Sequence, residues 1–257
     1  MGNSLIAING VSQIYATTEG APGWALKNVS LGIEAGEFVC IIGPSGCGKS
    51  TLLHMIAGFL KPTEGSLAFR GEPIRGSGPE RGVVFQEYAL FAWMTVLQNV
   101  EFGPRVKGLP KVERRARAMR YLEMVGLERA ADRYPHELSG GMRQRIAVAR
   151  ALVNEPEVLL MDEPFAAVDA ITRATLQEEL LRLWQQFRIC IVFITHNIDE
   201  AIFLGQRIVT MSPHPGSIRS SVPIDLPYPR DRGSTEFAQL YARIGAELYG
   251  PKSPEAA

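Results

Sequence analysis

The sequence has few cysteines, no excess of charge of either sign and no long hydrophobic run. Only three cysteines occur among 257 residues. They are widely spaced and form no CxxC pair, so we expect neither a disulfide scaffold nor a cysteine zinc site. Lysine plus arginine and aspartate plus glutamate number 27 each. Because a protein that binds a nucleic-acid backbone usually carries a basic excess, no nucleic-acid partner is expected.

The longest apolar runs, such as Phe38–Ile42 and Cys190–Ile194, have the length of strands and cannot span a bilayer. The N-terminal stretch MGNSLIAINGVSQIYATTEG lacks a basic segment followed by an apolar run, so no secretory signal is expected. Any membrane association should therefore come through a partner. Hydrophobic residues make up 46% of the chain, which suits a sizeable core in one large domain.

Short apolar runs alternate along the chain with longer segments of helical spacing. Strands that alternate with helices favour an α/β fold, in which helices cover both faces of a mostly parallel sheet. The expected strands are Phe38–Ile42, Gly82–Phe85, Val158–Met161, Ile189–Ile194 and Arg207–Met211. The expected helices are Lys49–Ala57, Lys111–Val125, Gly141–Val153, Ala170–Phe187 and Ile198–Leu204.

Three segments depart from this alternation within the single expected domain, residues 1–257. The first thirty-five residues alternate in polarity between turns, which predicts a small N-terminal antiparallel sheet. Residues 88–154 are rich in helix formers and contain no convincing strand, so they are expected to form an inserted helical subdomain. Residues 212–257 form an expected C-terminal extension, in which a proline- and serine-rich run along the surface precedes an amphipathic helix, Thr235–Tyr249.

The stretch GPSGCGKST, residues 43–51, follows the apolar run FVCII and precedes LLHMIAG. This order of strand, glycine-rich turn and helix is the context in which G-x-x-x-x-G-K-[ST] binds nucleotide phosphates. Glycines let backbone amides surround an anion, and the helix adds its positive end. Lys49 should reach the outer phosphates and Ser50 should bind Mg²⁺. A glycine turn with a chance lysine would not match every position of the motif. Cys47 has no expected chemical role but lies where a thiol reagent would obstruct nucleotide.

A second motif, VLLMDEP at residues 158–164, is an apolar strand that ends in two carboxylates. Neighbouring side chains on a strand point to opposite sides, so Asp162 and Glu163 are expected to have different roles. Asp162 suits the Mg²⁺ shell, and Glu163 suits a general base or positioning group for an attacking water. An acidic strand end that caps the next helix would account for one carboxylate but not for both.

The third motif, LSGGMRQR at residues 138–145, predicts a second anion site. Ser139 is a good N-cap, and Gly140 and Gly141 leave backbone amides exposed at the start of a helix. The same residues, taken alone, also fit an ordinary capped helix start with flexible glycines.

With these motifs in this order, the sequence resembles the nucleotide-binding domain of ATP-binding-cassette (ABC) transporters over nearly its whole length. The resemblance implies a P-loop NTPase core that binds ATP and Mg²⁺ and hydrolyses ATP. The ATP-binding residues that it implies are Tyr15, which stacks on adenine, and Gly43, Pro44, Ser45, Gly46, Cys47, Gly48, Lys49, Ser50 and Thr51. It implies catalytic roles for Lys49, Gln86, Glu163 and His196, and metal ligation by Ser50, Gln86 and Asp162.

In that family two such domains face each other head to tail, and each ATP lies between them. The resemblance therefore implies a homodimer or pseudo-dimer in which Ser139, Gly140, Gly141 and Asp169 serve the partner's nucleotide. Taken alone, Tyr15 also fits a core residue. His196 taken alone fits a turn histidine equally well.

The sequence departs from the family pattern at three places that touch no charged or metal-binding group. Met142 stands where glutamine is commoner, and Ala92 where proline is frequent. The segment around Asp169 reads FAAVDA, where Gly-Ala-Leu-Asp is usual. ATPase activity is therefore still expected.

The segments QEYALFAWMTVLQNV and MSPHPGSIRSSVPIDLPYPRD resemble the branch that serves importers of nitrate, taurine and aliphatic sulfonates. This implies a peripheral subunit at the cytoplasmic face of the cell membrane, bound to permease subunits and indirectly to a solute-binding protein. Phe91, Trp93 and Met94 are the expected permease contacts, with a core patch of the helical subdomain as the alternative. An importer ATPase for another small solute and a non-transport ABC ATPase also stay open. The latter would need a coiled-coil insertion or a second cassette, and neither occurs in this sequence.

Overall fold

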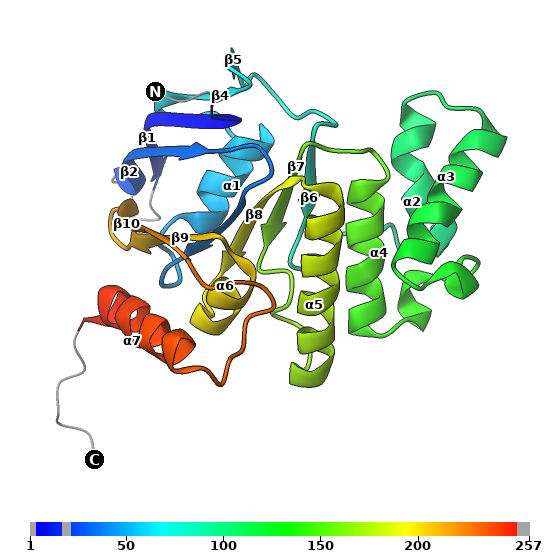
Figure 1. Cartoon of the computed structure of the whole chain (residues 1–257). Helices are drawn as coiled ribbons and strands as arrows, with labels where there is room; N and C mark the ends of the chain where they lie inside the picture. Colours follow the sequence, from blue (N-terminus) through cyan, green and yellow to red (C-terminus); the bar gives the residue numbers. More distant parts are fainter. Residues whose placement is uncertain (1–3, 17–21, 251–257) are drawn as a thin grey trace. The chain divides into compact units, whose positions relative to one another are not determined.

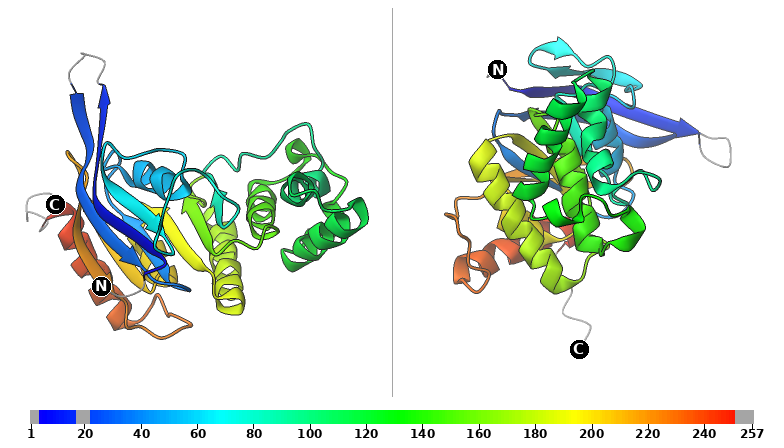
Figure 2. Two further views of the ribbon diagram at one scale, coloured as in Figure 1. Left: turned by 90° about the horizontal axis from the view of Figure 1, so that it is seen from above. Right: turned by 90° about the vertical axis from the view of Figure 1, so that its right-hand side faces the viewer.

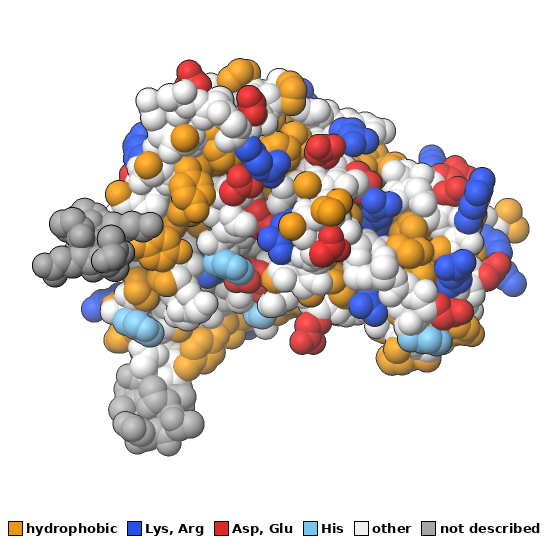
Figure 3. All heavy atoms as spheres, turned by 90° about the horizontal axis from the view of Figure 1, so that it is seen from below, with side chains coloured by type: hydrophobic (Ala, Val, Ile, Leu, Met, Phe, Trp, Pro, Cys, Tyr) orange, Lys and Arg blue, Asp and Glu red, His pale blue; other side chains and the backbone are white. Residues whose placement is uncertain are grey.

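The computed structural model describes residues 4–16 and 22–250, and the chain forms two compact units (Figure 1). The first unit combines Met1–Ser77 with Val192–Ala257, and the second unit is Gly78–Ile191. Within the described residues, no helix combines the length and the hydropathy that crossing a bilayer requires. Acidic and basic side chains lie interspersed on the face shown in Figure 3, in keeping with their equal numbers.

The first unit contains a four-stranded antiparallel sheet in the order β2-β1-β4-β5. Its strands are β1 (Ile6–Ala16), β2 (Pro22–Ile33), β4 (Glu64–Phe69) and β5 (Glu72–Pro73). Ile6 lies opposite Ile33 on one side and Phe69 on the other, and all three side chains are buried. The predicted N-terminal antiparallel sheet is confirmed, and β4 and β5, which were not predicted, extend it.

The first unit also contains neighbouring strands of a mostly parallel sheet, in the order β10-β9-β3-β8. They are β10 (Ser217–Pro223), β9 (Arg207–Ser212), β3 (Phe38–Ile42) and β8 (Cys190–Thr195), whose first two residues belong to the second unit. β3 pairs with β9 in parallel, and β10 pairs with β9 antiparallel. Every residue of β3 and β8 is buried, as expected for parallel strands covered on both faces.

Among the described residues of the first unit, these strands are accompanied by the helices α1 (Lys49–Ala57), α6 (Ile198–Leu204) and α7 (Thr235–Tyr249). α6 packs on β3, and α7 packs on α6 and β9. The amphipathic helix predicted at the C-terminal end is thus present as α7.

The second unit begins with β6 (Arg81–Val84), which pairs in parallel with β7 (Val158–Asp162). Between them the chain forms only helices: α2 (Val96–Val106), α3 (Lys111–Met124), the short 3-10 turns Glu128–Ala130 and Pro135–Glu137, and α4 (Gly140–Leu152). α2, α3 and α4 pack on one another (green in Figure 2), and α5 (Ala170–Phe187) follows β7. The predicted P-loop α/β fold is confirmed. That residues 88–154 form a separate inserted subdomain, and residues 212–257 a separate C-terminal extension, stays a prediction.

The helix α2 and the strand β10 were absent from the sequence prediction. α2 contains Gly103 and Pro104, which hide its periodicity, and a capping box starts it. In that box the Gln98 amide donates to Thr95 Oγ1 at 3.3 Å, and the Thr95 amide donates to Gln98 Oε1 at 2.9 Å. β10 lies at the edge of its sheet, where Pro223 is tolerated because the outer amide needs no partner strand.

Candidate functional site

The turn between β3 and α1 is shaped by its glycines. Gly46 and Gly48 have φ values of 78° and 91°, in the left-handed region that favours glycine. A Cβ on Gly48 would lie 2.4 Å from Leu26 Cδ2, and one on Gly43 would lie 2.7 Å from Cys47 Sγ. The turn is therefore too tightly packed for a side chain at Gly43 or Gly48, whereas Gly46 has open space and is required by its φ value alone.

Lys49 begins α1, and its buried side chain curls back over the turn. Its Nζ donates hydrogen bonds to the carbonyl oxygens of Gly43, at 2.8 Å, and Pro44, at 3.1 Å. No side chain caps α1 at Gly48, so its first amides depend on groups outside the helix for hydrogen bonds. An uncapped helix start next to an ammonium group fits a phosphate.

Cys47 is fully buried beneath this turn. Burial raises the pKa of its thiol, and the charge of nearby Lys49 opposes that shift only in part. The position expected to admit a thiol reagent is therefore closed in the folded protein, because a reagent needs both access and a thiolate. Leu26 lies against Gly48 and Met211 against Gly43, on either side of this cysteine in the sequence, and the motif alone did not reveal the burial.

Tyr15 lies near the end of β1 with 44% of its surface exposed. This exposure argues against a core residue and suits an aromatic ring that stacks on a planar ligand. The backbone partner of Tyr15 across the sheet is Gly23 on β2.

His196 is exposed and follows directly after β8. The turn that carries it is fixed by buried polar groups that the sequence analysis missed. Thr195 Oγ1 donates to Glu200 Oε2 at 2.6 Å and accepts from the Asn197 amide at 3.0 Å. Asn197 Oδ1 also accepts from the amide of Asp199 at 2.9 Å, capping α6. The sequence signal for this arrangement is the spacing T-H-N-x-x-E, which places Glu200 three residues after the N-cap Asn197, in the first turn of α6.

In the second unit, Asp162 ends β7 and is half-buried, and Glu163 lies just beyond the strand. Glu163 has φ 42°, in the left-handed region that is unusual for a non-glycine residue. Its carbonyl accepts from the Ala166 amide at 3.1 Å, which closes a tight turn. The prediction that both carboxylates lie on one strand was therefore wrong, because β7 ends at Asp162. The turn at Glu163, and not the alternation of side chains along a strand, separates the two carboxylates. Backbone held in such a region marks strain of the kind found at functional sites.

Ser139 caps α4 as predicted, since its Oγ accepts from the Met142 amide at 3.3 Å. A Cβ on Gly141 would lie 2.6 Å from Thr172 Cγ2, so this glycine permits α4 to approach α5 closely. Gly140 lies at the first position of α4. A Cβ there would make only ordinary contact with Tyr88 Oη, at 3.4 Å.

Asp169 is the N-cap of α5, where its Oδ1 accepts from the Thr172 amide at 3.0 Å. The hydrogen bond from this amide holds the pKa of the carboxyl below its usual range. Asp169 thus has a capping role within its own chain, beside the role toward a partner that the sequence predicts.

Gln86 is exposed in the turn that follows β6. The next residues, Tyr88 and Ala89, have φ values of 62° and 47°, and Arg150 of α4 holds both carbonyl groups. The guanidinium of Arg143 lies 5.6 Å from the centre of the Tyr88 ring. From the sequence, both arginines were predicted only to lie within a helix.

The aromatic segment after Gln86 is anchored from within and exposed at its tip. Asn99, fully buried, accepts from the Phe91 amide at 2.8 Å and donates to the Met94 carbonyl at 3.1 Å. The rings of Phe91 and Trp93 lie 5.5 Å apart, and 74% of the Trp93 surface is exposed. The core-patch alternative therefore fails for Trp93, while Phe91 and Met94 are half-buried.

The expected site residues are divided between the two units. The first unit carries Tyr15, residues 43–51 and His196, and the second carries Gln86, Ser139, Gly140, Gly141, Asp162, Glu163 and Asp169. Among the described residues, no group of three histidine, cysteine or acidic side chains is placed to hold a metal ion. A magnesium site would instead draw on a hydroxyl, an amide and a carboxylate.

Comparison with known proteins gives consistent matches. The ABC transporter family profile matches residues 26–166. An uncharacterized ABC transporter ATP-binding protein of Methanocaldococcus jannaschii is 52% identical over 220 residues, which cover 86% of this chain and 82% of that protein. The nitrate import ATP-binding protein of Synechocystis is 51% identical over 240 residues, 90% of each chain. The taurine import ATP-binding protein of Roseobacter denitrificans is 48% identical over 213 residues, 83% of this chain and 80% of that protein.

Solved structures of ATP-binding cassettes also superpose on this chain. A dimeric ATP-binding cassette in a post-hydrolysis state, bound to ADP and Pi, superposes with a TM-score of 0.77 at 35% identity. The match covers 86% of this chain and 99% of that chain. The cbiO1 protein of Clostridium perfringens, part of an ABC transporter complex, superposes with a TM-score of 0.78 at 29% identity over 95% of each chain.

Proposed function

The chain belongs to the ABC transporter family as an ATP-binding and ATP-hydrolysing protein, and from this premise we propose that it powers the import of a small anion. Membership of the family rests on the matched profile and on relatives that are about half identical to this chain over most of their length. Relatives at 51%, 48% and 48% identity are a nitrate import, a taurine import and a bicarbonate transport ATP-binding protein. All three solutes are small and carry an anionic group, which supports this class of cargo and leaves its identity open.

The turn at residues 43–51 binds the phosphates in this proposal. Its packed glycines present backbone amides, α1 contributes its uncapped positive end, and Lys49 exchanges its bonds to Gly43 and Pro44 for phosphate oxygens. Tyr15, exposed on β1, stacks on the adenine ring. The geometry of this turn is the observation that carries the nucleotide part of the proposal.

The oxygen donors of Ser50, Gln86 and Asp162 suit Mg²⁺, which prefers hydroxyl, amide and carboxylate oxygens. When bound, Mg²⁺ neutralises phosphate charge. Glu163 then positions the attacking water and takes its proton, and His196 donates a hydrogen bond to the outer phosphate. The tight turn after β7 fixes the backbone at Glu163, and the hydrogen bonds of Thr195 fix the turn that carries His196.

The proposal includes a second copy or a close relative of the chain. Ser139, Gly140 and Gly141 at the start of α4, together with Asp169, complete the nucleotide site of that partner. Two observations support this: α4 offers a second helix start next to glycines, and a similar cassette was solved as a dimer with ADP and Pi.

Permease subunits complete the assembly in this proposal, with a solute-binding protein that delivers the cargo. The chain itself is peripheral, at the cytoplasmic face of the membrane. Its exposed Trp93, supported by Phe91 and Met94, docks on the permease. An exposed aromatic side chain held by an anchored loop is suited to such a contact.

The test is reconstitution of the chain with its permease in liposomes, with the binding protein added. We expect ATP hydrolysis to rise when one small anion among nitrate, bicarbonate, taurine and alkanesulfonates is supplied. Stimulation by a sugar or a cation alone would favour an importer of another solute. Failure to assemble with any permease would favour an ABC ATPase without a transport role.

A further inference from the structure

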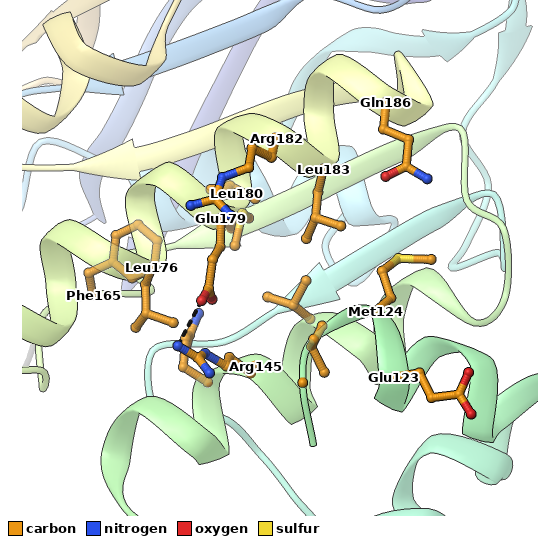
Figure 4. Close-up of a pocket in the computed structure, with 15 residues that line it drawn as sticks. Glu123, Met124, Arg145, Phe165, Leu176, Glu179, Leu180, Arg182, Leu183 and Gln186 are labelled. Atoms are coloured by element: carbon orange, nitrogen blue, oxygen red, sulfur yellow. Dashed lines mark ion pairs between the residues drawn. The ribbon is translucent and has the colours of Figure 1, made fainter. Parts of the chain in front are cut away.

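The second unit contains a cavity of about 390 Å³ between the end of α3, the middle of α4 and the length of α5 (Figure 4). A volume of this size is within the range of sites that bind small organic molecules. None of the residues assigned to ATP lines it. The cavity therefore needs an explanation of its own.

The walls of the cavity are mostly apolar. Figure 4 shows three leucines from α5 on one side and the end of α3 on the other. The apolar lining residues are Met124, Val125, Val148, Met161, Phe165, Leu176, Leu180 and Leu183. These side chains suit a hydrocarbon or aromatic body.

Two side chains in the lining have buried polar atoms without a hydrogen-bond partner among the described residues: Gln144, at both amide atoms, and Arg145, at Nε only. Gln144 of α4 is only 1% exposed, and neither its Nε2 nor its Oε1 makes a hydrogen bond to any residue that the structure describes. An unsatisfied buried amide costs about 1–3 kcal/mol per group in general, so it needs a bonding partner. The Gln144 amide offers a donor and an acceptor side by side. A carboxamide or lactam edge presents the same two groups in the complementary order.

The charges around the cavity balance. Arg145 on α4 and Glu179 on α5 form an ion pair at 2.7 Å, drawn in Figure 4. Arg182 and Glu123 add one further charge of each sign to the lining. Burial raises the pKa of the Glu179 carboxyl, and Arg145 opposes that shift. The formal charges of the lining cancel, since two arginines and two glutamates contribute to it, so a neutral ligand is favoured.

We propose that this cavity binds a small neutral molecule with an apolar body and a carboxamide-type edge, and that the bound molecule regulates ATP hydrolysis. α4 begins at the cap Ser139 and α5 at the cap Asp169, so both helices that line the cavity start at residues assigned to nucleotide contact. The two helices touch at Gly141 and Thr172, one turn before the cavity opens at Gln144 and Leu176. A molecule bound in the cavity sets the distance between α4 and α5 at the level of Gln144 and Leu176, one turn beyond the contact of Gly141 with Thr172.

The binding test uses 3-phenylpropanamide as the probe and 3-phenylpropanol as its analogue without the amide. The protein carries ¹³C-methyl methionine, and spectra are recorded without nucleotide, so a failure to bind is distinguishable from a failure of ATP hydrolysis. We expect saturable shifts of the Met124 and Met161 methyl signals, while Met94, outside the cavity, does not shift. Unchanged Met124 and Met161 signals at the solubility limit of the probe would overturn the proposal, as would equal shifts at Met94.

Two variants locate the site. Gln144→Met removes the amide at similar volume and should weaken the amide probe about tenfold while leaving the alcohol unaffected. Val148→Phe fills the cavity and should abolish binding of both. Val112→Phe, at a position 84% exposed on α3, is the matched control and should bind normally. Equal affinity for the amide in wild type and Gln144→Met contradicts the proposed recognition, even if Val148→Phe fails to fold.

The proposed regulation is tested by measuring ATP turnover of the whole protein with and without saturating 3-phenylpropanamide. We expect a change in kcat of at least about twofold that follows the binding curve and is retained in Val112→Phe. Binding at Met124 and Met161 with unchanged kcat would refute the regulatory role.

Discussion

Arg150 on α4 donates a hydrogen bond to the carbonyl of Tyr88 at 2.9 Å, and a second at 2.6 Å to the neighbouring Ala89 carbonyl. It thereby joins the turn after Gln86 to the helix that Ser139 caps. Desolvation by burial lowers the pKa of the Arg150 guanidinium, yet the two carbonyls hold it in place. The strained φ values of Tyr88 and Ala89 show that this contact shapes the turn.

Replacing Arg150 tests whether its hydrogen bonds to the Tyr88 and Ala89 carbonyls hold the turn after Gln86 in position. In Arg150→Ala two carbonyl groups lose a charged donor, so the free energy of unfolding should fall by about 2 kcal/mol. ATP turnover should fall several-fold because Gln86 is no longer positioned, while the Kd for ATP changes little. Urea unfolding and turnover assays measure both. Arg243→Ala, which removes only an exposed pair with Glu247, is the control and should match wild type. Normal turnover in a folded Arg150→Ala variant would contradict the link.

Thr195→Val tests how His196 is held. The valine keeps the volume but removes the hydrogen bonds to Glu200 Oε2 and from the Asn197 amide. We expect kcat to fall about tenfold with unchanged ATP affinity, whereas Thr195→Ser should retain most of the activity. Stopped-flow binding of a fluorescent ATP analogue separates affinity from kcat. Equal kcat for the valine and serine variants would show that the hydroxyl does not position His196.

Thiol reactivity should be low in the native protein. Cys40, Cys47 and Cys190 are all fully buried, and burial raises the pKa of Cys40 and Cys47. Treatment with N-ethylmaleimide at pH 7 should label no cysteine within the time that labels all three in urea, as read by mass spectrometry. ATP hydrolysis should survive the treatment. Fast labelling of Cys47 in the folded protein would contradict the packing of the phosphate turn.

Stability should decline at alkaline pH. Burial raises the pKa of Tyr228 from 10.0 to about 12, so the folded state keeps a proton that the unfolded chain loses. A raised folded pKa gives stability that is fully present below pH 10.0 and is lost as pH rises toward 12. Urea unfolding between those pH values measures the slope, which should be smaller in Tyr228→Phe. That variant also loses the hydrogen bond to the Leu204 carbonyl, so its stability at neutral pH should be lower. A slope equal to that of wild type would refute the assignment to Tyr228.

Trp93→Glu tests the permease contact. Because the side chain is 74% exposed, its loss should change the free energy of unfolding by no more than about 0.5 kcal/mol. Co-purification with the permease should be lost, since a carboxylate replaces the apolar contact. Val112→Glu, at a position 84% exposed on α3, is the matched control and should co-purify normally. Intact assembly of Trp93→Glu would remove Trp93 from the docking surface.

The sequence predicted those parts of the fold that have a strong apolar signal. β3, β7 and β8 are continuous buried runs, and α5 and α7 have clear helical spacing, so their boundaries were within one residue. The strands β4, β5 and β10 were not predicted, because most of their residues are exposed or polar and form a strand only through pairing with neighbouring strands. α2 escaped because Pro104 interrupts its pattern.

The motifs predicted which residues form the candidate site, but not what holds them. Residue types in order identify Lys49, Glu163 and Ser139. The bond from Arg150 to Tyr88 spans 62 residues of sequence, and no local pattern reports it. The left-handed φ of Glu163 is equally invisible, because it comes from the closure of the turn after β7 and not from the residue type. Cavities such as that beside Gln144 arise only from the packing of whole helices.

The most direct test of the account is ATP turnover in Glu163→Gln beside wild type, with ATP binding and dimer formation measured in the same samples. Glutamine keeps the shape but cannot take a proton, so we expect kcat to fall about 100-fold or more. The variant should still bind ATP and should accumulate as an ATP-bound dimer in size-exclusion chromatography. Turnover equal to that of wild type would contradict the role of Glu163 and, with it, the proposed hydrolytic site.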